Sequence, residues 1–261
     1  LAAPIRLEMT DPKDQTTTAR PGKLKTVSSA EHRLVQNATA KLGDLAIAST
    51  ITTEFDGMVK IELTLDPKQP VDLKALRMVV PLAADQVDYF HAAARGIRYG
   101  FDYGYIPAGQ GRLWDSRQVG ANPMVVGSFV PYIYVGGPEA GLCWFADSDE
   151  GWVPNDAVPA FELRRDPATK GKSVDLVFNL ISEAFTVDTP RTIVFAFQAT
   201  PVKKIHDQWR MDSWWCGDTF NDLQFLGKNG GHQIWTSIPF TLDPDACKAM
   251  VEARHKVTNG F

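Results

Sequence analysis

The sequence predicts an all-β protein, an antiparallel β-sandwich, followed by the first strand and helix of a further domain. Two observations carry this prediction. From about residue 41 to residue 200, apolar and polar residues alternate with a period of two, in short runs that Gly, Pro and Asp clusters separate. Beyond Pro201 the pattern changes to one apolar run and one helical repeat. Several short alternating strands bounded by turn residues are typical of a β-sandwich.

The clearest element is a hairpin over residues 45–65. Apolar residues at 45, 47, 51 and 55 share one parity, and a second alternating run returns over 59–65. Asp56-Gly57 lies between the two runs, and Gly tolerates the positive φ that a two-residue turn requires. We therefore expect a half-buried antiparallel pair of strands joined by a two-residue turn.

Further strands follow the same pattern. We expect them at residues 76–82, 125–135, 142–146, 174–180 and 193–197. Residues 95–111 break the alternation with a Gly-, Tyr- and Arg-rich sequence, which indicates a surface or inter-domain loop. The first forty residues are polar, so we expect residues 1–40 to form a loosely ordered segment or an edge strand. The sandwich domain is then expected at residues 41–202.

The C-terminal part predicts one strand and one helix. Residues 232–239 form a single apolar run. Asp243 then suits a helix N-cap, Pro244 suits the first helical position, and small or apolar residues follow at helical spacing. One strand–helix unit cannot cover its own sheet, so we expect residues 203–261 to begin a larger α/β domain.

Composition limits the class of protein. Of the 261 residues, 44% are apolar and 22% are charged, which is ordinary for a globular protein with a full core. The net charge of −4 gives no basic surface for nucleic acid. No apolar stretch reaches the roughly 18–20 residues that cross a bilayer. We expect neither nucleic acid nor a membrane as a partner.

The sequence predicts no cofactor and no metal site. The three cysteines lack CxxC spacing, and the five histidines lack any HxH or HxxxH pair. P-loops, dinucleotide-binding GxGxxG motifs and GxSxG nucleophile elbows are also missing from the sequence. The chain begins at Leu1 without an initiator Met or a signal peptide, so we expect processing or excision from a longer protein.

The stretch from Tyr132 to Trp152 is the strongest candidate for a binding site. Trp144 and Trp152 flank the carboxylates of Asp147 and Asp149. An indole face can stack on the apolar side of a sugar ring, and carboxylates accept hydrogen bonds from its hydroxyls. Two carboxylates can also hydrolyse a glycosidic bond, although the sequence does not set their separation. The same residues could instead be a sandwich core followed by a solvated acidic turn, and we favour this second interpretation.

Trp214 and Trp215 form a second aromatic candidate just after the sandwich. Pockets favour domain interfaces, so these rings could line a carbohydrate cleft. They could also fill the interface between the sandwich and the next domain, which we favour. The predicted carbohydrate-binding residues are therefore Trp144, Asp147, Asp149, Trp152, Trp214 and Trp215.

Three motifs together resemble a known family. They are Glu54-Phe-Asp-Gly57, Gly141-Leu-Cys-Trp-Phe-Ala-Asp-Ser-Asp-Glu-Gly-Trp152 and Phe197-Gln-Ala-Thr-Pro-Val202. In this order they resemble the N-terminal β-sandwich region of an uncharacterised glycoside-hydrolase-like family. That family is related to the exo-β-N-acetylgalactosaminidases of glycoside hydrolase family 123. The middle motif is the most specific of the three.

The resemblance implies that a (β/α)8 barrel follows the sandwich, with residues 232–239 and 243–256 as its first strand and helix. It also implies an adjacent acidic pair on a later barrel strand, with the substrate's own acetamido group as nucleophile. No position of this chain can receive those roles, so the catalytic residues are unknown here and we expect the chain alone to be inactive.

We therefore expect a glycoside-hydrolase-like, polysaccharide-degrading protein that is secreted or periplasmic. Its partners would be carbohydrate and the remainder of its own barrel, which the sandwich would support. The alternative is a non-catalytic carbohydrate-binding β-sandwich module.

Overall fold

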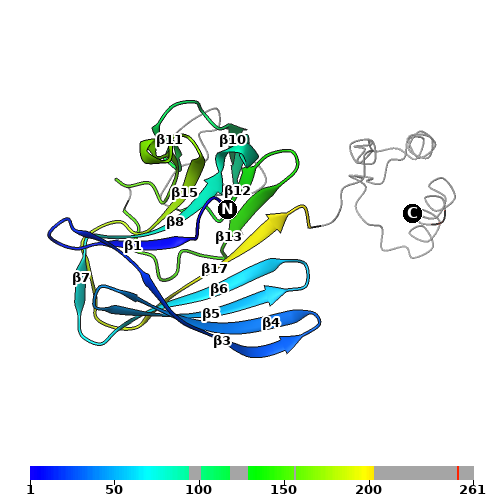
Figure 1. Cartoon of the computed structure of the whole chain (residues 1–261). Coiled ribbons are helices and arrows are strands. Elements are labelled where there is room, and N and C mark those ends of the chain that lie inside the picture. The colour runs from blue at the N-terminus through cyan, green and yellow to red at the C-terminus, as the bar shows by residue number, and fades with distance from the viewer. Residues whose placement is uncertain (94–100, 118–128, 156, 203–251, 253–261) are drawn as a thin grey trace. The chain divides into compact units, whose positions relative to one another are not determined.

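The computed structural model in Figure 1 describes residues 1–93, 101–117, 129–155, 157–202 and 252. The chain divides into two compact units, Leu1–Val202 and Lys203–Phe261. The strand predicted at 232–239 and, apart from Glu252, the helix predicted at 243–256 lie outside the described residues, as therefore does the start of a barrel. Within the described ranges, no helix has the length and apolar character needed to cross a membrane.

The first unit is built from antiparallel sheets. The six-stranded sheet has the spatial order β11 (Gly111–Asp115), β14 (Phe161–Arg165), β15 (Ser173–Ile181), β8 (Ala75–Ala83), β1 (Arg6–Thr10) and β2 (Thr16–Thr18). The nine-stranded sheet has the order β10 (Phe101–Tyr105), β9 (Tyr89–Ala93), β12 (Tyr132–Gly136), β13 (Gly141–Phe145), β17 (Arg191–Thr200), β6 (Met58–Pro67), β5 (Leu45–Glu54), β4 (Arg33–Leu42) and β3 (Arg20–Ala30). A small ribbon pairs β16 (Phe185–Val187) with β7 (Val71–Leu73). The predicted all-β, antiparallel class is confirmed.

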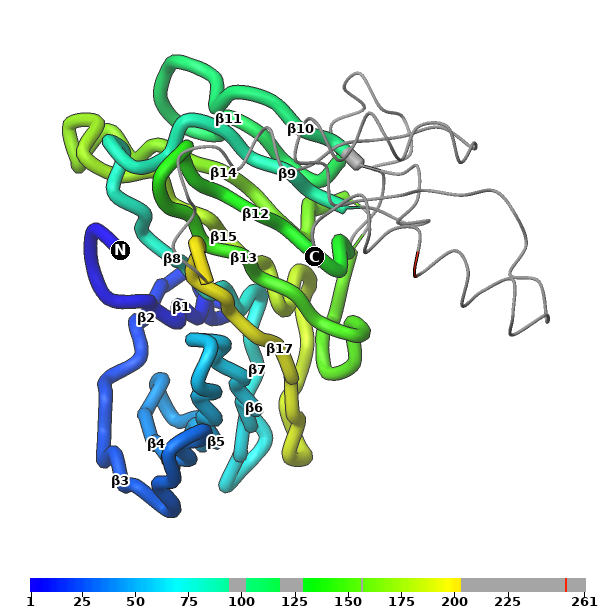
Figure 2. Tube along the Cα trace, turned by 90° about the vertical axis from the view of Figure 1, so that its right-hand side faces the viewer, coloured from blue at the N-terminus to red at the C-terminus, as the bar shows by residue number. Residues whose placement is uncertain are grey.

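The core lies between the two large sheets, where side chains from both meet. Trp144 of β13 lies 4.9 Å from Phe178 of β15, and Phe90 of β9 lies 4.9 Å from Trp114 of β11, measured between ring centroids. In Figure 2, β17 lies between the part of the nine-stranded sheet that holds β9, β12 and β13 and the part that holds β3–β6. Fully burying each such side chain contributes about 1.5–3 kcal/mol, so these cross-sheet contacts hold the sandwich together.

The predicted hairpin is present as β5 and β6, which pair along their whole length. Its connection has three residues, Phe55–Gly57, instead of the two that we expected. The amide of Gly57 donates to the carbonyl of Glu54 at 3.0 Å, and Gly57 has a φ of 86°. A three-residue connection that ends in a left-handed glycine is the next most common hairpin type after two-residue turns.

The other predicted strands that fall on described residues are also present. β8, β13, β15 and β17 overlap the predicted runs at 76–82, 142–146, 174–180 and 193–197. β12 covers only the end of the run predicted at 125–135, and residues 125–128 lie outside the described part.

The N-terminal forty residues form strands, and one of these is an edge strand, the second of the two alternatives that we gave. β1 pairs with β8 in the six-stranded sheet, and its Met9 is part of the core. β3 forms the edge of the nine-stranded sheet, and all eleven of its residues are exposed. The polar sequence thus reflects a solvated edge strand and a strand with one buried face, and the compact unit begins at Leu1, not at residue 41.

The segment 95–111 is not simply a loop, because Phe101–Tyr105 forms β10 and pairs with β9. The residue of β10 that points inward is Asp102, which is buried and accepts a hydrogen bond of 2.8 Å from Nε1 of Trp114. Trp114 belongs to the other sheet, so this bond links the two layers. A carboxylate on the inner face conceals the apolar alternation from which a strand is predicted.

This link gives a first prediction. Asp102→Ala leaves the buried indole N–H of Trp114 without an acceptor, and we expect the free energy of unfolding to fall by about 1–3 kcal/mol. Asp102→Asn keeps an oxygen acceptor of the same shape and is expected to lose clearly less. Urea denaturation of both variants measures the difference. Equal losses in the two variants would show that the hydrogen bond does not stabilise the fold.

Candidate functional site

The tryptophans of the Gly141–Trp152 run lie in the core. Trp144 has no exposed surface, and its ring lies 5.0 Å from Phe161 and 6.1 Å from Trp152. Trp152 is 5% exposed and lies 5.7 Å from Phe161 in a stacked arrangement. Neither indole has a free face on which a sugar could stack. For these two residues the structure therefore supports the core interpretation and removes them as sugar contacts.

The acidic residues of the same run lie on the surface. Asp147 and Asp149 are exposed, in a loop whose end is fixed by a hydrogen bond of 2.9 Å from the amide of Trp152 to the carbonyl of Asp149. Gly151 closes this loop against β17, with a φ of 84°. A Cβ at Gly151 would lie 2.2 Å from the carbonyl oxygen of Thr192. The loop is thus built by a close backbone approach that only glycine permits.

The predicted residues do not come together as one site in the described part of the chain. Trp144 and Trp152 point inward while Asp147 and Asp149 face solvent. Trp214 and Trp215 lie outside the described residues. The contribution of Asp147, Asp149 and these two tryptophans to carbohydrate binding stays a prediction.

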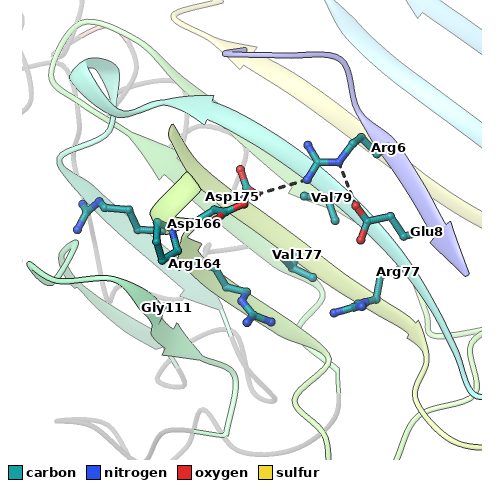
Figure 3. A pocket seen from close by; sticks show the side chains of 11 residues that line it. Arg6, Glu8, Arg77, Val79, Gly111, Arg164, Asp166, Asp175 and Val177 are labelled. Atoms are coloured by element: carbon teal, nitrogen blue, oxygen red, sulfur yellow. Dashed lines mark hydrogen bonds and ion pairs between the residues drawn. The ribbon is translucent and has the colours of Figure 1, made fainter. Parts of the chain in front are cut away.

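A different group of polar residues lines a depression of about 330 Å³ on the six-stranded sheet (Figure 3). Its lining comes from β1, β8, β11, β14 and β15 and from the turn after β14. The polar members include Arg6, Glu8, Arg77, Arg164, Asp166 and Asp175. Apart from Asp166, which lies in the turn after β14, these residues occupy the strand positions that alternate with the core residues, so they share the face of the sheet turned away from the core.

The strand register explains how these charges meet. Arg77 of β8 lies directly between Glu8 of β1 and Asn179 of β15. Asp175 of β15 lies opposite Arg164 of β14. Residues that face each other across antiparallel strands have Cβ atoms about 4.5–5.5 Å apart, so their side chains interact.

Two networks of ion pairs and hydrogen bonds pair most of the charged and polar groups on this face. Arg6 contacts Glu8 at 3.0 Å through Nε and Asp175 Oδ2 at 3.5 Å through Nη2, as Figure 3 shows. Glu162, which is 6% exposed, accepts from Nδ2 of Asn179 at 2.9 Å and pairs with Arg164 at 3.6 Å. Glu162 is therefore held by both of its neighbours.

Two buried atoms on this face remain without a hydrogen-bond partner among the described residues, Nε of Arg77 and Oδ1 of Asp175. Asp175 is 8% exposed, and this burial raises the pKa of its carboxyl group, an effect that the nearby Arg6 opposes. A buried polar atom without a partner is uncommon in proteins and needs an explanation, and among the described residues Nε1 of Trp144 and Nε1 of Trp152 in the core are two further cases. Within the described ranges no group of three or more His, Cys, Asp or Glu side chains is arranged to hold a metal ion.

Sequence reasoning missed this face. The alternating polar residues of strands 76–82 and 174–180 were visible, but no site was predicted from them. Which strands pair, and hence which charges become neighbours, depends on β1, β8 and the β14–β15 pair, which are far apart in the sequence.

A family model described as "Glycoside hydrolase 123, third domain" matches residues 1–129. The chain is related to glycoside hydrolase family 123. The match confirms the relation that the three motifs suggested, although only the first motif, Glu54–Gly57, lies inside the matched residues. The position of the sandwich at the N-terminus of a parent protein stays a prediction.

Other comparisons add little to the relation with family 123. No curated protein matches the chain. Among solved structures, a protein named "Putative aldose 1-epimerase" from Escherichia coli K12 is 10% identical, with 74% of this chain and 78% of that chain covered. The TM-score of 0.33 is too low to support an argument.

The acidic loop gives a second prediction. Gly151→Ala and Gly171→Ala both place an alanine at a φ near +80°, but only Gly151 lies against another backbone, since nothing lies within 4 Å of a Cβ at Gly171. We expect Gly151→Ala to lower the free energy of unfolding by roughly 1–3 kcal/mol more than Gly171→Ala. Urea denaturation of both variants measures this difference, and equal effects would contradict the close approach to β17.

The raised pKa of Asp175 gives a third prediction. Because the folded protein holds this proton more tightly than the unfolded chain, the resulting stabilisation is present below the ordinary pKa of 3.8 and is lost as pH rises through the higher folded pKa. Asp175→Asn removes the buried charge, so we expect it to gain stability relative to the wild type at pH 7 and to show a smaller gain at pH 3.

Chemical denaturation at the two pH values tests this. Asp149→Asn, which changes an exposed loop carboxylate in the same way, serves as the control and is expected to leave the free energy of unfolding nearly unchanged. A loss of stability at pH 7 on Asp175→Asn would show that the carboxylate stabilises the fold.

Proposed function

We propose that this chain is the β-sandwich portion of a glycoside-hydrolase-related protein that acts on carbohydrate. The sandwich supports a (β/α)8 barrel that begins within residues 203–261, and the catalytic residues lie beyond Phe261. The observation that carries the proposal is the match of residues 1–129 to the third domain of family 123. Secretion or a periplasmic location, and a role in polysaccharide degradation, belong to the same proposal.

Three carboxylates of the described unit, Glu162, Asp147 and Asp149, support a non-catalytic role for the sandwich. Glycoside hydrolysis needs two carboxyl groups that flank the bond, about 5–5.5 Å apart in retaining enzymes and 6.5–9.5 Å apart in inverting ones. Buried Glu162 is held by Asn179 and Arg164, and Asp147 and Asp149 lie in an exposed loop without a tryptophan platform. None of these arrangements presents a free acid and a free base to one sugar.

The test compares the 261-residue chain with its full parent protein. We expect the chain alone to hydrolyse no aryl N-acetylgalactosaminide and the parent protein to do so. Turnover by the isolated chain that is abolished by Asp147→Asn or Asp149→Asn would overturn the assignment of catalysis to the barrel.

A carbohydrate-binding module is the second candidate, and the polar depression on the six-stranded sheet favours it. In this role the sandwich would hold a glycan without reacting with it. Trp214 and Trp215 are the remaining candidates for stacking platforms, since Trp144 and Trp152 are buried. Glycan binding that is lost on Trp214→Ala or Trp215→Ala in folded protein would support this function and the predicted sites.

A further inference from the structure

Arg77 is a cation whose immediate neighbours are already engaged. Glu8 lies beside it on β1, but its carboxylate pairs with Arg6 at 3.0 Å. Asn179 lies beside it on β15, but its amide nitrogen donates to Glu162 and to the carbonyl of Pro159. Among the described residues the side chain of Arg77 makes no hydrogen bond or ion pair, and its Nε is buried. The guanidinium is therefore free to bind an anion from outside the chain.

Asp175 supplies a hydrogen-bond acceptor in the same depression, where Arg77 supplies donors. Its Oδ2 faces Arg6 at 3.5 Å, while its Oδ1 is buried and makes no hydrogen bond, although the nearby Ser173 hydroxyl helps Arg6 to lower the pKa of this carboxyl group. Arg164 lies opposite in register but pairs with Glu162. Asp175 is a buried residue, 8% exposed, and it lines the depression. A ligand that donates a hydroxyl proton would complete its hydrogen bonding.

The charge and size of the depression restrict the ligand further. Its lining holds four arginines against three carboxylates, whereas the whole chain has a net charge of −4. Its volume of about 330 Å³ lies at the lower end of the range for small-molecule sites, which suits one ring and not a long chain. Figure 3 shows Arg77 and Asp175 at different sides of Val177, so an occupant that meets both must carry polar groups at two of its edges.

We propose that this depression binds a hexuronate, a sugar ring that carries both a carboxylate and hydroxyl groups. The carboxylate pairs with Arg77, because a guanidinium binds a carboxylate through two parallel N–H donors. A ring hydroxyl donates to Oδ1 of Asp175. The proposal rests on the carbohydrate part of the proposed function and names the class of sugar that the sandwich holds.

Titration calorimetry of the 261-residue chain tests the proposal. The probes are methyl glucuronide and methyl galacturonide, the corresponding neutral methyl glycosides, and inorganic sulfate. We expect at least one uronide to bind about tenfold or more tightly than its neutral glycoside, because hydrogen bonds to charged groups contribute about 1.5–3 kcal/mol. Equal binding of uronide and neutral glycoside, or binding of neither uronide, overturns the proposal.

Three variants assign the contacts. Arg77→Gln is expected to weaken uronide binding about tenfold or more, and Arg77→Lys, which keeps the charge but not the two parallel donors, to weaken it less. Arg33→Gln is the matched control, since Arg33 lies on β4 of the other sheet, where it pairs with Glu54 at 3.6 Å. Uronide binding that survives Arg77→Gln, or that falls equally on Arg33→Gln, overturns the role of Arg77.

Asp175→Asn distinguishes a sugar site from a simple anion site. We expect this variant to weaken uronide binding and to leave any sulfate binding unweakened, since sulfate has no hydroxyl to donate. Sulfate that binds as tightly as the uronide, with no effect of Asp175→Asn on the uronide, would leave only an anion site and overturn the sugar assignment.

Two further measurements distinguish failure of the proposed binding site from loss of folding and from failure of the proposed function. Thermal unfolding of Arg77→Gln is expected to show no loss of stability, because the replaced group has no partner to lose. Turnover of N-acetylgalactosaminides by the parent protein reports on the proposed enzyme independently of this site. If the parent protein shows no turnover but the chain binds a uronide, the proposed enzyme activity is wrong and the binding site stands. If the parent protein shows turnover but the chain binds no uronide, only the proposed binding site is wrong.

Discussion

The structure depends most on the burial of β15 on both of its faces. All nine residues of this strand are buried, and it lies between β8 and β14 in the six-stranded sheet. One face carries apolar side chains such as Leu176 and Phe178, which meet the other sheet in the core. The opposite face carries Asp175 and Asn179, which are polar and yet buried. Every neighbour of β15 must therefore supply either apolar contacts or hydrogen bonds.

The burial of the core-facing side of β15 explains the aromatic residues of the Gly141–Trp152 run. Phe178 packs against Trp144 of the other sheet, and Phe161 of β14 packs against both Trp144 and Trp152. An aromatic pair contributes about 0.5–1.5 kcal/mol beyond the area that it buries, so this cluster is a large local source of stability. Tryptophans next to an acidic loop are equally compatible with a sugar site and with a core, and only the partner strands decide between the two.

The sequence was sufficient to predict those strands whose pairing or burial follows from a local pattern. The β5–β6 hairpin could be predicted because its pairing involves neighbouring runs and one glycine turn. The inner faces of β8, β15 and β17 could be predicted because apolar residues recur at every second position. β10 was missed because its inward residue is Asp102, and a buried carboxylate cannot be told from a surface one without knowing Trp114.

The candidate site could not be predicted for a related reason. Most of its charges come from strands that are joined by long-range pairing, from β1 at the start of the chain through β8 to β15 near residue 180. Glu8, Arg77 and Asn179 become neighbours through two registers that no local pattern encodes. The alternation marked each residue as polar and outward, but the depth of burial follows from the assembled sheet.

The unpaired atoms on the outer face also bear on why this face is charged at all. Apolar side chains of similar size at positions 77 and 175 would bury the same surface without an unsatisfied nitrogen or oxygen, and replacing buried ions in this way is often neutral or stabilising. Glu162 and Asn179 show that the sheet can satisfy a buried polar group when both neighbours turn toward it. Arg77 and Asp175 are placed beside such neighbours, yet Nε of Arg77 and Oδ1 of Asp175 stay unpaired, although Oδ2 of Asp175 faces Arg6. Stability alone therefore gives no account of these two unpaired atoms, and the proposed ligand, which carries both an acid and a hydroxyl, would give one.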